Sequence, residues 1–335
     1  MLELTEIREI MSHFDISVEN VSDCFDTSRS ENDQRFNYVL DKKYVLKVNS
    51  AHVMWESRLN EIDRLIHRYL SIGLYCPKML MTTENQFSYH LIKDKKEYIC
   101  YVEEYAEYPV LGFDAGHDRN EVIEHLGILA ARYTNVDLSD IKSMWSIIDL
   151  APLDNEIDEK QENTDLLIKT LQQQGYDELA IQVDEYNRML RDKIKAVFDQ
   201  LPRCVYQGDL NPTNELFHDG HFVGLIDFNM AGTDVNINVF LNETNCFPEE
   251  KDFDELTVQN MITKMNEDQS KAISVILKHY SLNDTEIHAM PHYKRLINLF
   301  QYPNVCQMCE WLTDTERKEK CAELIKTLIE MPLCT

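Results

Sequence analysis

Basic side chains are scarce relative to acidic ones in this chain. There are 33 lysines and arginines against 59 aspartates and glutamates, which gives a formal net charge of −26 at pH 7. Such a charge repels the phosphates of nucleic acids and the headgroups of anionic lipids. The sequence therefore predicts that neither nucleic acid nor a membrane surface is a partner.

Long apolar runs are also lacking. No window approaches the roughly 20 consecutive apolar residues that a membrane-spanning helix needs. The first ten residues, M-L-E-L-T-E-I-R-E-I, do not form the basic segment and apolar core of a secretory signal. We therefore expect a soluble, cytoplasmic protein.

The cysteines do not form a recognisable framework. Nine of them, an odd number, are scattered along the chain, which does not suggest paired disulfides in a protein of this length. Cys306 and Cys309 make a lone C-x-x-C without a second pair at zinc-ribbon spacing. We expect no metal or redox role for these thiols.

The predicted secondary structure changes near residue 105 from mainly short strands to mainly helices. The earlier part favours short strands at 35–40, 44–48, 77–80, 89–92 and 98–102, with helices at 4–14 and from a Ser50 cap to about residue 70. Beyond residue 109 the pattern predicts helices at 121–133, 140–150 behind a Ser139 cap, 165–174, 177–201, 255–279 and 316–329, with strands only at 215–217 and 222–226. This order predicts an α+β, bilobal fold, with a small sheet carrying one helix in a nucleotide-binding lobe (1–105) and a large, mainly helical catalytic and substrate lobe (106–335).

The segment from Gln207 to Asp227 contains the candidate catalytic and metal-binding residues. Asp209 and Asn214 match D-L-x-x-x-N of the kinase catalytic loop, and Asp227-Phe228 matches the start of D-F-G. In such a site Asp209 would accept the proton of the attacking hydroxyl, while Asn214 and Asp227 would hold Mg²⁺ through oxygen atoms. Asp and Asn around a proline are also ordinary turn formers, so the ordered set of motifs counts for more than either one alone.

Lys47 is the candidate phosphate-binding lysine. It lies in the apolar segment Tyr44–Val48, where the alternation of a strand could turn it either to a phosphate or to solvent. A lysine with that role usually pairs with a glutamate of the next helix. Glu61 is preferred to Glu56 because it borders the apolar stripe of that helix.

These motifs resemble the aminoglycoside phosphotransferase and choline kinase family, whose signature is H-G-D-x-x-x-x-N followed by I-D-F or I-D-W. The resemblance implies a protein-kinase-like fold, ATP and Mg²⁺ as cofactors, and phosphoryl transfer to a hydroxyl of an aminoglycoside-like, amino-alcohol or sugar acceptor. It also implies that the Glu103 carbonyl and the Tyr105 amide bind the purine. A protein kinase fits less well because no A-P-E follows Asp227.

Three features depart from the family pattern. Gln207 replaces the usual histidine, Asn238 stands where a second aspartate is common, and the presumed nucleotide-covering loop 26–33 contains no glycine. In that loop Ser28 and Ser30 could donate hydroxyl hydrogen bonds to the nucleotide instead. These departures leave open an alternative, a catalytically silent pseudokinase that serves as a nucleotide-binding or regulatory module. Residues 111–335 carry 40 acidic and 20 basic side chains. This acidic second lobe either attracts a cationic acceptor or merely keeps the protein soluble.

Overall fold

The computed structural model describes residues 1–112, 118–148 and 157–332. The chain divides into two compact units, one formed by Met1–His117 and Asp209–Asn229 and the other by Asp118–Gly208 and Met230–Thr335. The sequence places residues 209–229 in the second lobe, so the compact units and the predicted lobes do not coincide. The predicted α+β class, with a small sheet and a mainly helical remainder, is confirmed.

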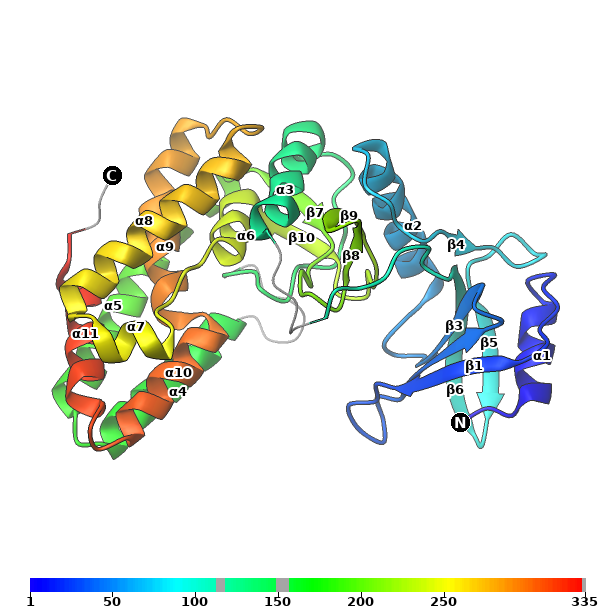
Figure 1. The fold of residues 1–335 in the computed structure, drawn as a ribbon, viewed down its shortest axis with the longest axis horizontal. Coiled ribbons are helices and arrows are strands. Elements are labelled where there is room, and N and C mark those ends of the chain that lie inside the picture. The colour runs from blue at the N-terminus through cyan, green and yellow to red at the C-terminus, as the bar shows by residue number, and fades with distance from the viewer. Residues whose placement is uncertain (113–117, 149–156, 333–335) are drawn as a thin grey trace. The chain divides into compact units, whose positions relative to one another are not determined.

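The first unit is built on an antiparallel sheet (Figure 1). Its strands are β1 (Val21–Asp26), β2 (Arg35–Leu40), β3 (Tyr44–Ser50), β4 (Met79–Leu80), β5 (Tyr89–Lys93) and β6 (Lys96–Glu104). They follow the order β1-β2-β3-β6-β4, and β5 also pairs with β6. The predicted β2–β3 hairpin is confirmed, and its turn places Asp41 and Lys42 at φ of 51° and 53°. Strand β1 was not predicted.

Two helices accompany this sheet. Helix α1 (Leu4–Ser12) contributes Ile7, Ile10 and Met11 to an apolar core that it shares with the sheet. Helix α2 (Glu56–Ser71) buries the apolar face that its sequence predicts, from Leu59 to Tyr69. The expected Ser50 cap is wrong: Ser50 ends β3, and its hydroxyl accepts the Gln34 amide at 2.9 Å.

The later segment of the first unit forms the predicted hairpin of β8 (Glu215–His218) and β9 (His221–Leu225). Asp219 and Gly220 turn the chain with φ of 50° and 82°. Gly224 bridges Tyr75 and Leu216 bridges Val110, so the hairpin pairs with the segment between α2 and β4 and with the segment after β6. The hairpin therefore lies in the same compact unit as Lys47.

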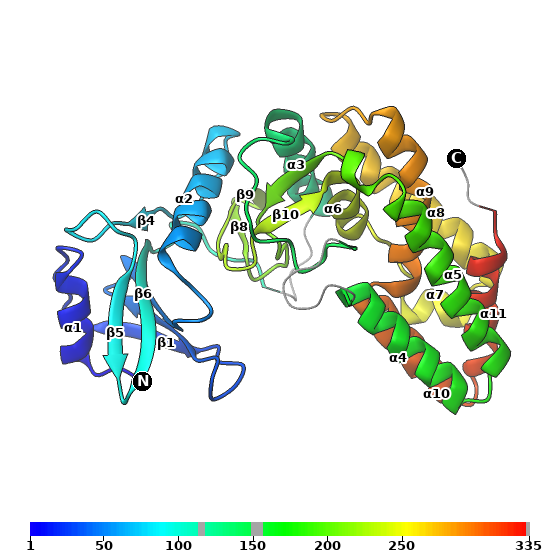
Figure 2. The same cartoon turned by 180° about the vertical axis from the view of Figure 1, so that it is seen from behind.

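The second unit is mainly helical (Figure 2). Its helices are α3 (Arg119–Tyr133), α4 (Glu159–Gln173), α5 (Asp177–Lys195), η1 (Phe198–Gln200), α6 (Asn236–Glu243), α7 (Glu250–Glu255), α8 (Val258–Leu277), α9 (Asp284–Phe300), α10 (Tyr302–Thr313) and α11 (Lys318–Glu330). Helix α4 packs along α10 and α5. Across the described ranges, no helix is both long and apolar enough to cross a membrane.

The second unit corrects two expectations. The helix predicted at 140–150 is wrong: residues 140–148 are irregular, Lys142 bridges Thr233, and 149–150 lie outside the described residues. A pair of short strands, β7 (Arg203–Tyr206) and β10 (Gly232–Val235), was missed. Close pairing with β10 explains why the helical pattern at 140–148 does not prevail, since tertiary contacts override local propensity.

Candidate functional site

Lys47 is buried rather than turned to solvent. Its residue is 6% exposed, and its Nζ lies 3.1 Å from Glu103 Oε2 and 3.2 Å from Asp227 Oδ1. Burial by itself lowers the pKa of Lys47, but the Asp227 and Glu103 carboxylates outweigh this effect and raise the pKa well above its ordinary value. Lys47 is therefore a fixed cation between two carboxylates.

The register of the sheet explains the contact with Glu103. Lys47 pairs with Tyr101 across β3 and β6, and Glu103 follows Tyr101 by two residues on the same face. Burial raises the pKa of Glu103, and the Lys47 ammonium opposes that rise. The strand β6, not the helix α2, thus supplies the glutamate that holds Lys47.

The pairing of Lys47 with Glu61 is therefore wrong. Glu61 Oε2 lies 3.3 Å from Arg58 Nη1. Glu56 accepts the Phe87 and Ser88 amides at 3.0 and 2.9 Å. Glu56 therefore holds the loop at Phe87 and Ser88, and Glu61 holds Arg58.

The backbone groups expected to bind a purine are used within the sheet. The Tyr105 amide donates to the Lys43 carbonyl at 2.8 Å. Glu103 is paired with Val45 on one side and with Met79 on the other. This arrangement does not fit the predicted role of the Glu103 carbonyl and the Tyr105 amide.

Asp227 occupies an unusual backbone conformation at the end of the β8–β9 hairpin. Its φ is 56°, a region that residues other than glycine seldom adopt, and its side chain is 41% exposed. The preceding Ile226 amide donates to the Asn214 carbonyl at 2.9 Å. The following Phe228 is buried and meets the Tyr69 ring edge to face at 5.4 Å. These contacts fix the backbone on both sides of Asp227.

Asn229, where D-F-G has glycine, anchors the same loop. The Tyr101 hydroxyl donates to Asn229 Oδ1 at 2.7 Å, and Arg58 Nη2 donates to the Asn229 carbonyl at 3.4 Å. Because Glu61 orients Arg58, the helix glutamate acts on the Asp227 loop rather than on Lys47.

Asp209 and Asn214 are joined directly. Asn214 Nδ2 donates to Asp209 Oδ2 at 2.9 Å and to the Asp209 carbonyl at 3.0 Å, while Asn211 Nδ2 donates to Asp209 Oδ1 at 2.8 Å. Asn214 is 6% exposed. Since its amide nitrogen is engaged, Asn214 Oδ1 is the atom left for a ligand.

The donor set fits Mg²⁺, which takes oxygen ligands. Mg²⁺ is commonly bound by one or two carboxylates together with waters and substrate phosphates, rather than by a complete protein cage. Asp227 and Asn214 offer that kind of partial set. Among the described residues, no group of three or more His, Cys, Asp or Glu is arranged to hold a metal ion.

The loop 26–33 is held by its own side chains. Ser28 Oγ accepts the Arg35 amide at 3.0 Å, and Ser30 Oγ accepts the Asp33 amide at 3.1 Å. Arg35 forms two bonds with Asp33, at 2.7 and 2.8 Å. The serines thus shape a glycine-free loop, and their contact with a nucleotide stays a prediction.

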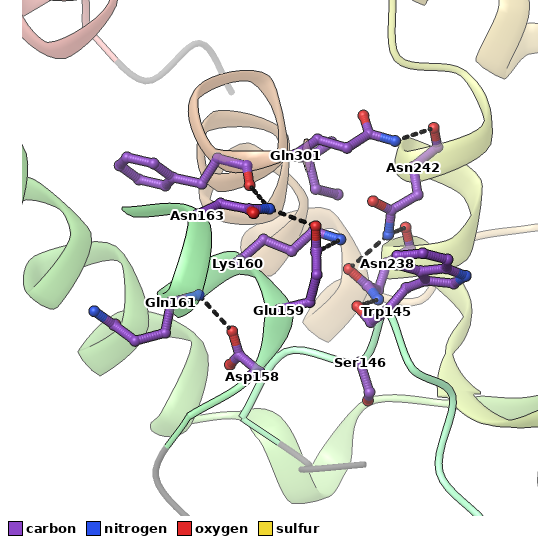
Figure 3. Close-up of polar contacts among 12 residues, drawn as sticks. Trp145, Ser146, Asp158, Glu159, Lys160, Gln161, Asn163, Asn238, Asn242 and Gln301 are labelled. Carbon is purple, nitrogen blue, oxygen red and sulfur yellow. Dashed lines mark hydrogen bonds and ion pairs between the residues drawn. The ribbon is translucent and has the colours of Figure 1, made fainter. Parts of the chain in front are cut away.

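In the second unit, polar side chains lie around the residues that lead into Asp209. Trp145 Nε1 donates to the Gly208 carbonyl at 2.7 Å, a contact missed because a helix was expected around Trp145. Asn238 Nδ2 donates to the Trp145 carbonyl at 3.0 Å (Figure 3). It also donates to both Asp234 oxygens, each at 3.0 Å. Burial raises the pKa of Asp234 to about 6. Position 238 is the one at which the family commonly has a second aspartate, and here Asn238 donates to the Asp234 carboxylate instead. Gln207 is fully buried.

Three solved structures share the fold although their sequences differ widely. An amicoumacin kinase in complex with AMP-PNP and Ca²⁺ is 12% identical, with 98% of this chain and 94% of that chain covered and a TM-score of 0.55. An aminoglycoside phosphotransferase from Alicyclobacillus acidocaldarius is 11% identical, with 96% and 94% covered and a TM-score of 0.51. A microcompartment-associated aminopropanol kinase is 13% identical, with 98% and 95% covered and a TM-score of 0.50.

Comparison with curated proteins gives no match. The model of the phosphotransferase enzyme family matches residues 27–235, a span that includes Lys47, Asp209, Asn214 and Asp227. The chain therefore belongs to the phosphotransferase enzyme family, and it is a small-molecule phosphotransferase with a protein-kinase-like fold, as its motifs predict.

Proposed function

We propose that the chain transfers the terminal phosphoryl group of magnesium-bound ATP to a hydroxyl of a small acceptor. The observation that carries this proposal is the contact of Lys47 with Asp227, which lies 180 residues later in the chain. The Asp209–Asn214 pair lies in the same compact unit. The AMP-PNP bound to the amicoumacin kinase supports a nucleoside triphosphate as donor.

Lys47, Asn214 and Asp227 would bind the nucleotide complex. Lys47 would pair with its phosphates, as the corresponding lysine of kinases does, and Glu103 would keep the ammonium oriented. Asn214 Oδ1 and the Asp227 carboxylate would hold Mg²⁺, which supplies charge neutralisation for the phosphates. Ser28 and Ser30 would contribute hydroxyl donors from loop 26–33.

Asp209 would orient the acceptor hydroxyl and accept its proton. Each of its carboxylate oxygens already accepts one side-chain amide, from Asn211 or Asn214. These bonds fix the orientation of the carboxylate. The fixed carboxylate would thus accept a hydrogen bond from an acceptor hydroxyl in a defined orientation.

The acceptor proposed here is a cationic hydroxyl compound of the aminoglycoside or amino-alcohol kind, with a sugar as the neutral case. The net charge of −26 supports it, because a negative field raises the local concentration of a cationic acceptor. The fold shared with an aminopropanol kinase and an aminoglycoside phosphotransferase agrees with this chemistry.

A screen of ADP release tests the proposal. Purified protein is incubated with ATP, Mg²⁺ and aminoglycosides, amino alcohols or hexosamines, and the thermal midpoint is measured in parallel. We expect Mg²⁺-dependent stabilisation by ATP and ADP release with at least one acceptor class. Stabilisation without turnover on any acceptor would contradict the proposal and favour the silent binding module.

A further inference from the structure

We propose that Trp145 is a positioning residue for the catalytic loop, because its indole fixes the peptide that leads into Asp209. This inference rests on the proposed role of Asp209. Trp145 would touch neither nucleotide nor acceptor in this role. It would act through the Gly208 carbonyl, which its Nε1 meets at 2.7 Å.

The geometry of Gly208 makes this bond consequential. The carbonyl of Gly208 and the amide nitrogen of Asp209 belong to one planar peptide group, so a bond that fixes the carbonyl also fixes the orientation of that plane. Gly208 has a φ of 83°, and a Cβ built on it would lie 2.3 Å from the Met230 carbonyl oxygen. The loop is therefore confined by Met230 and by the indole of Trp145.

The backbone of Trp145 is itself held by polar contacts. Its amide donates to Ser143 Oγ at 3.2 Å, and its carbonyl accepts Asn238 Nδ2 at 3.0 Å. Asn238 in turn donates to both oxygens of Asp234. Asn238 and Asp234 are almost completely buried, so water does not compete for these bonds.

A buried lysine holds the ring of Trp145. Lys160 is 1% exposed, and its Nζ lies 5.7 Å from the centroid of the indole and 2.9 Å from Glu159 Oε2 (Figure 3). A cation over an aromatic face is attracted by the quadrupole of the ring, whose face is electron-rich. A lysine is almost never buried without a compensating partner. The Glu159 carboxylate compensates the charge of Lys160, and the cation over the ring restrains the indole.

Trp311 provides a matched control. It is 1% exposed and stacks on Phe253 with ring centroids 3.8 Å apart. Within the part of the chain that the structure describes, its Nε1 has no hydrogen-bond partner. Trp145→Phe and Trp311→Phe both delete an indole N–H from the second unit. The first substitution removes a bond to the catalytic loop, whereas the second removes none.

The test compares the two variants by hydrogen–deuterium exchange and by kinetics. For Trp145→Phe we expect faster exchange in the peptide covering residues 207–214 and, with the acceptor found by the screen, at least an approximately tenfold fall in kcat. The KM for ATP should change by less than about twofold, because Trp145 would not contact the nucleotide and its loss should not weaken nucleotide binding. Trp311→Phe should leave both the exchange of that peptide and kcat at the wild-type level.

Equal effects of the two substitutions, or unchanged exchange at 207–214 in Trp145→Phe, would overturn the inference. If Trp145→Phe does not fold, Lys160→Met keeps the indole N–H but removes the cation from the ring, and it should also raise exchange in the same peptide. Unchanged exchange in that variant would overturn the inference as well. Hydrogen–deuterium exchange can be measured without turnover. A wild-type protein that is inactive with every acceptor would therefore refute the proposed function, while the exchange of residues 207–214 would still test the role of Trp145.

Discussion

Lys47 can be charged in the interior because Glu103 and Asp227 surround its ammonium. The two carboxylates are not equivalent. Glu103 is fixed by the sheet register, whereas Asp227 is half-buried and belongs to the loop that would hold Mg²⁺. Glu103 would therefore remain the partner of Lys47 when Asp227 engages the nucleotide complex.

A comparison of two glutamates tests this assignment. Glu103→Gln replaces the carboxylate that orients Lys47, and loss of such a charge-assisted bond costs about 1.5 to 3 kcal/mol. We expect the variant to bind MgATP roughly tenfold more weakly, as titration calorimetry would show. Glu61→Gln should weaken binding less, because Glu61 contacts Arg58. A larger loss in Glu61→Gln would restore the helix glutamate as the partner.

Asp234 should make stability depend on pH. Burial raises its pKa to about 6 from an ordinary value of 3.8, so the folded protein holds this proton where the unfolded chain has lost it. The free energy of unfolding should therefore fall as pH rises from about 4 to about 6, by an amount on the order of 3 kcal/mol, and then stay level.

The variant Asp234→Asn isolates this contribution because an amide does not ionise. It keeps one oxygen acceptor for Asn238 and should flatten the difference in the free energy of unfolding between pH 4 and pH 6. Urea unfolding at several pH values measures the slope. An identical slope in the variant and the wild type would show that Asp234 does not carry the effect.

The candidate site residues that lie close together in sequence are the ones whose proximity could be predicted, and their roles stay predictions. Asp209, Asn214 and Asp227 follow one another in a single loop and hairpin. Glu103 could not be recognised as the partner of Lys47, because cross-strand register is not visible in a strand's own residues. Trp145 was missed since its role depends on a contact with Gly208, 63 residues away.

Elements with a clear local signal were predicted well. The β2–β3 and β8–β9 hairpins have alternating residues and turn formers, and the apolar stripe of α2 has helical spacing. The strands β7 and β10 are four residues each, so their pattern is too short to recognise. Pairing with Thr233 similarly decides the irregular structure around Lys142.

Strand β9 should depend on Gly224, its fourth residue. A Cβ at Gly224 would lie 1.9 Å from the Tyr75 carbonyl oxygen. The Tyr75 amide and carbonyl also bond to Val223 and Leu225 on either side, so the chains cannot easily separate. The close approach is thus built into the connection between the hairpin and the segment after α2.

We expect Gly224→Ala to lower the free energy of unfolding by about 3 kcal/mol or more, because an added methyl group would overpack this contact. Urea denaturation with the midpoint and slope analysed together measures the change. Gly220→Asn is the control, since Gly220 has open space around it and asparagine tolerates its φ of 82°. Similar losses in both variants would contradict the steric explanation.

At the scale of the whole molecule, the charge should influence which acceptor is preferred. With a formal charge of −26, attraction of a cationic acceptor should weaken as salt screens it. We expect kcat/KM for an amino-bearing acceptor to fall several-fold between low and high ionic strength. A neutral hexosamine derivative should show little change. Equal salt dependence for the two acceptors would leave the acidic surface without a role in acceptor capture.

The combination of Lys47 and Asp227 with the Asp209–Asn214 pair in one compact unit is the central physical feature of this chain. The most direct test follows the terminal phosphoryl group from ATP to the acceptor in the wild type and in Asp209→Asn, with MgATP affinity measured on the same samples. We predict that transfer falls by about 10²- to 10⁴-fold in the variant while MgATP affinity stays close to that of the wild type. Undiminished transfer by Asp209→Asn would contradict the account.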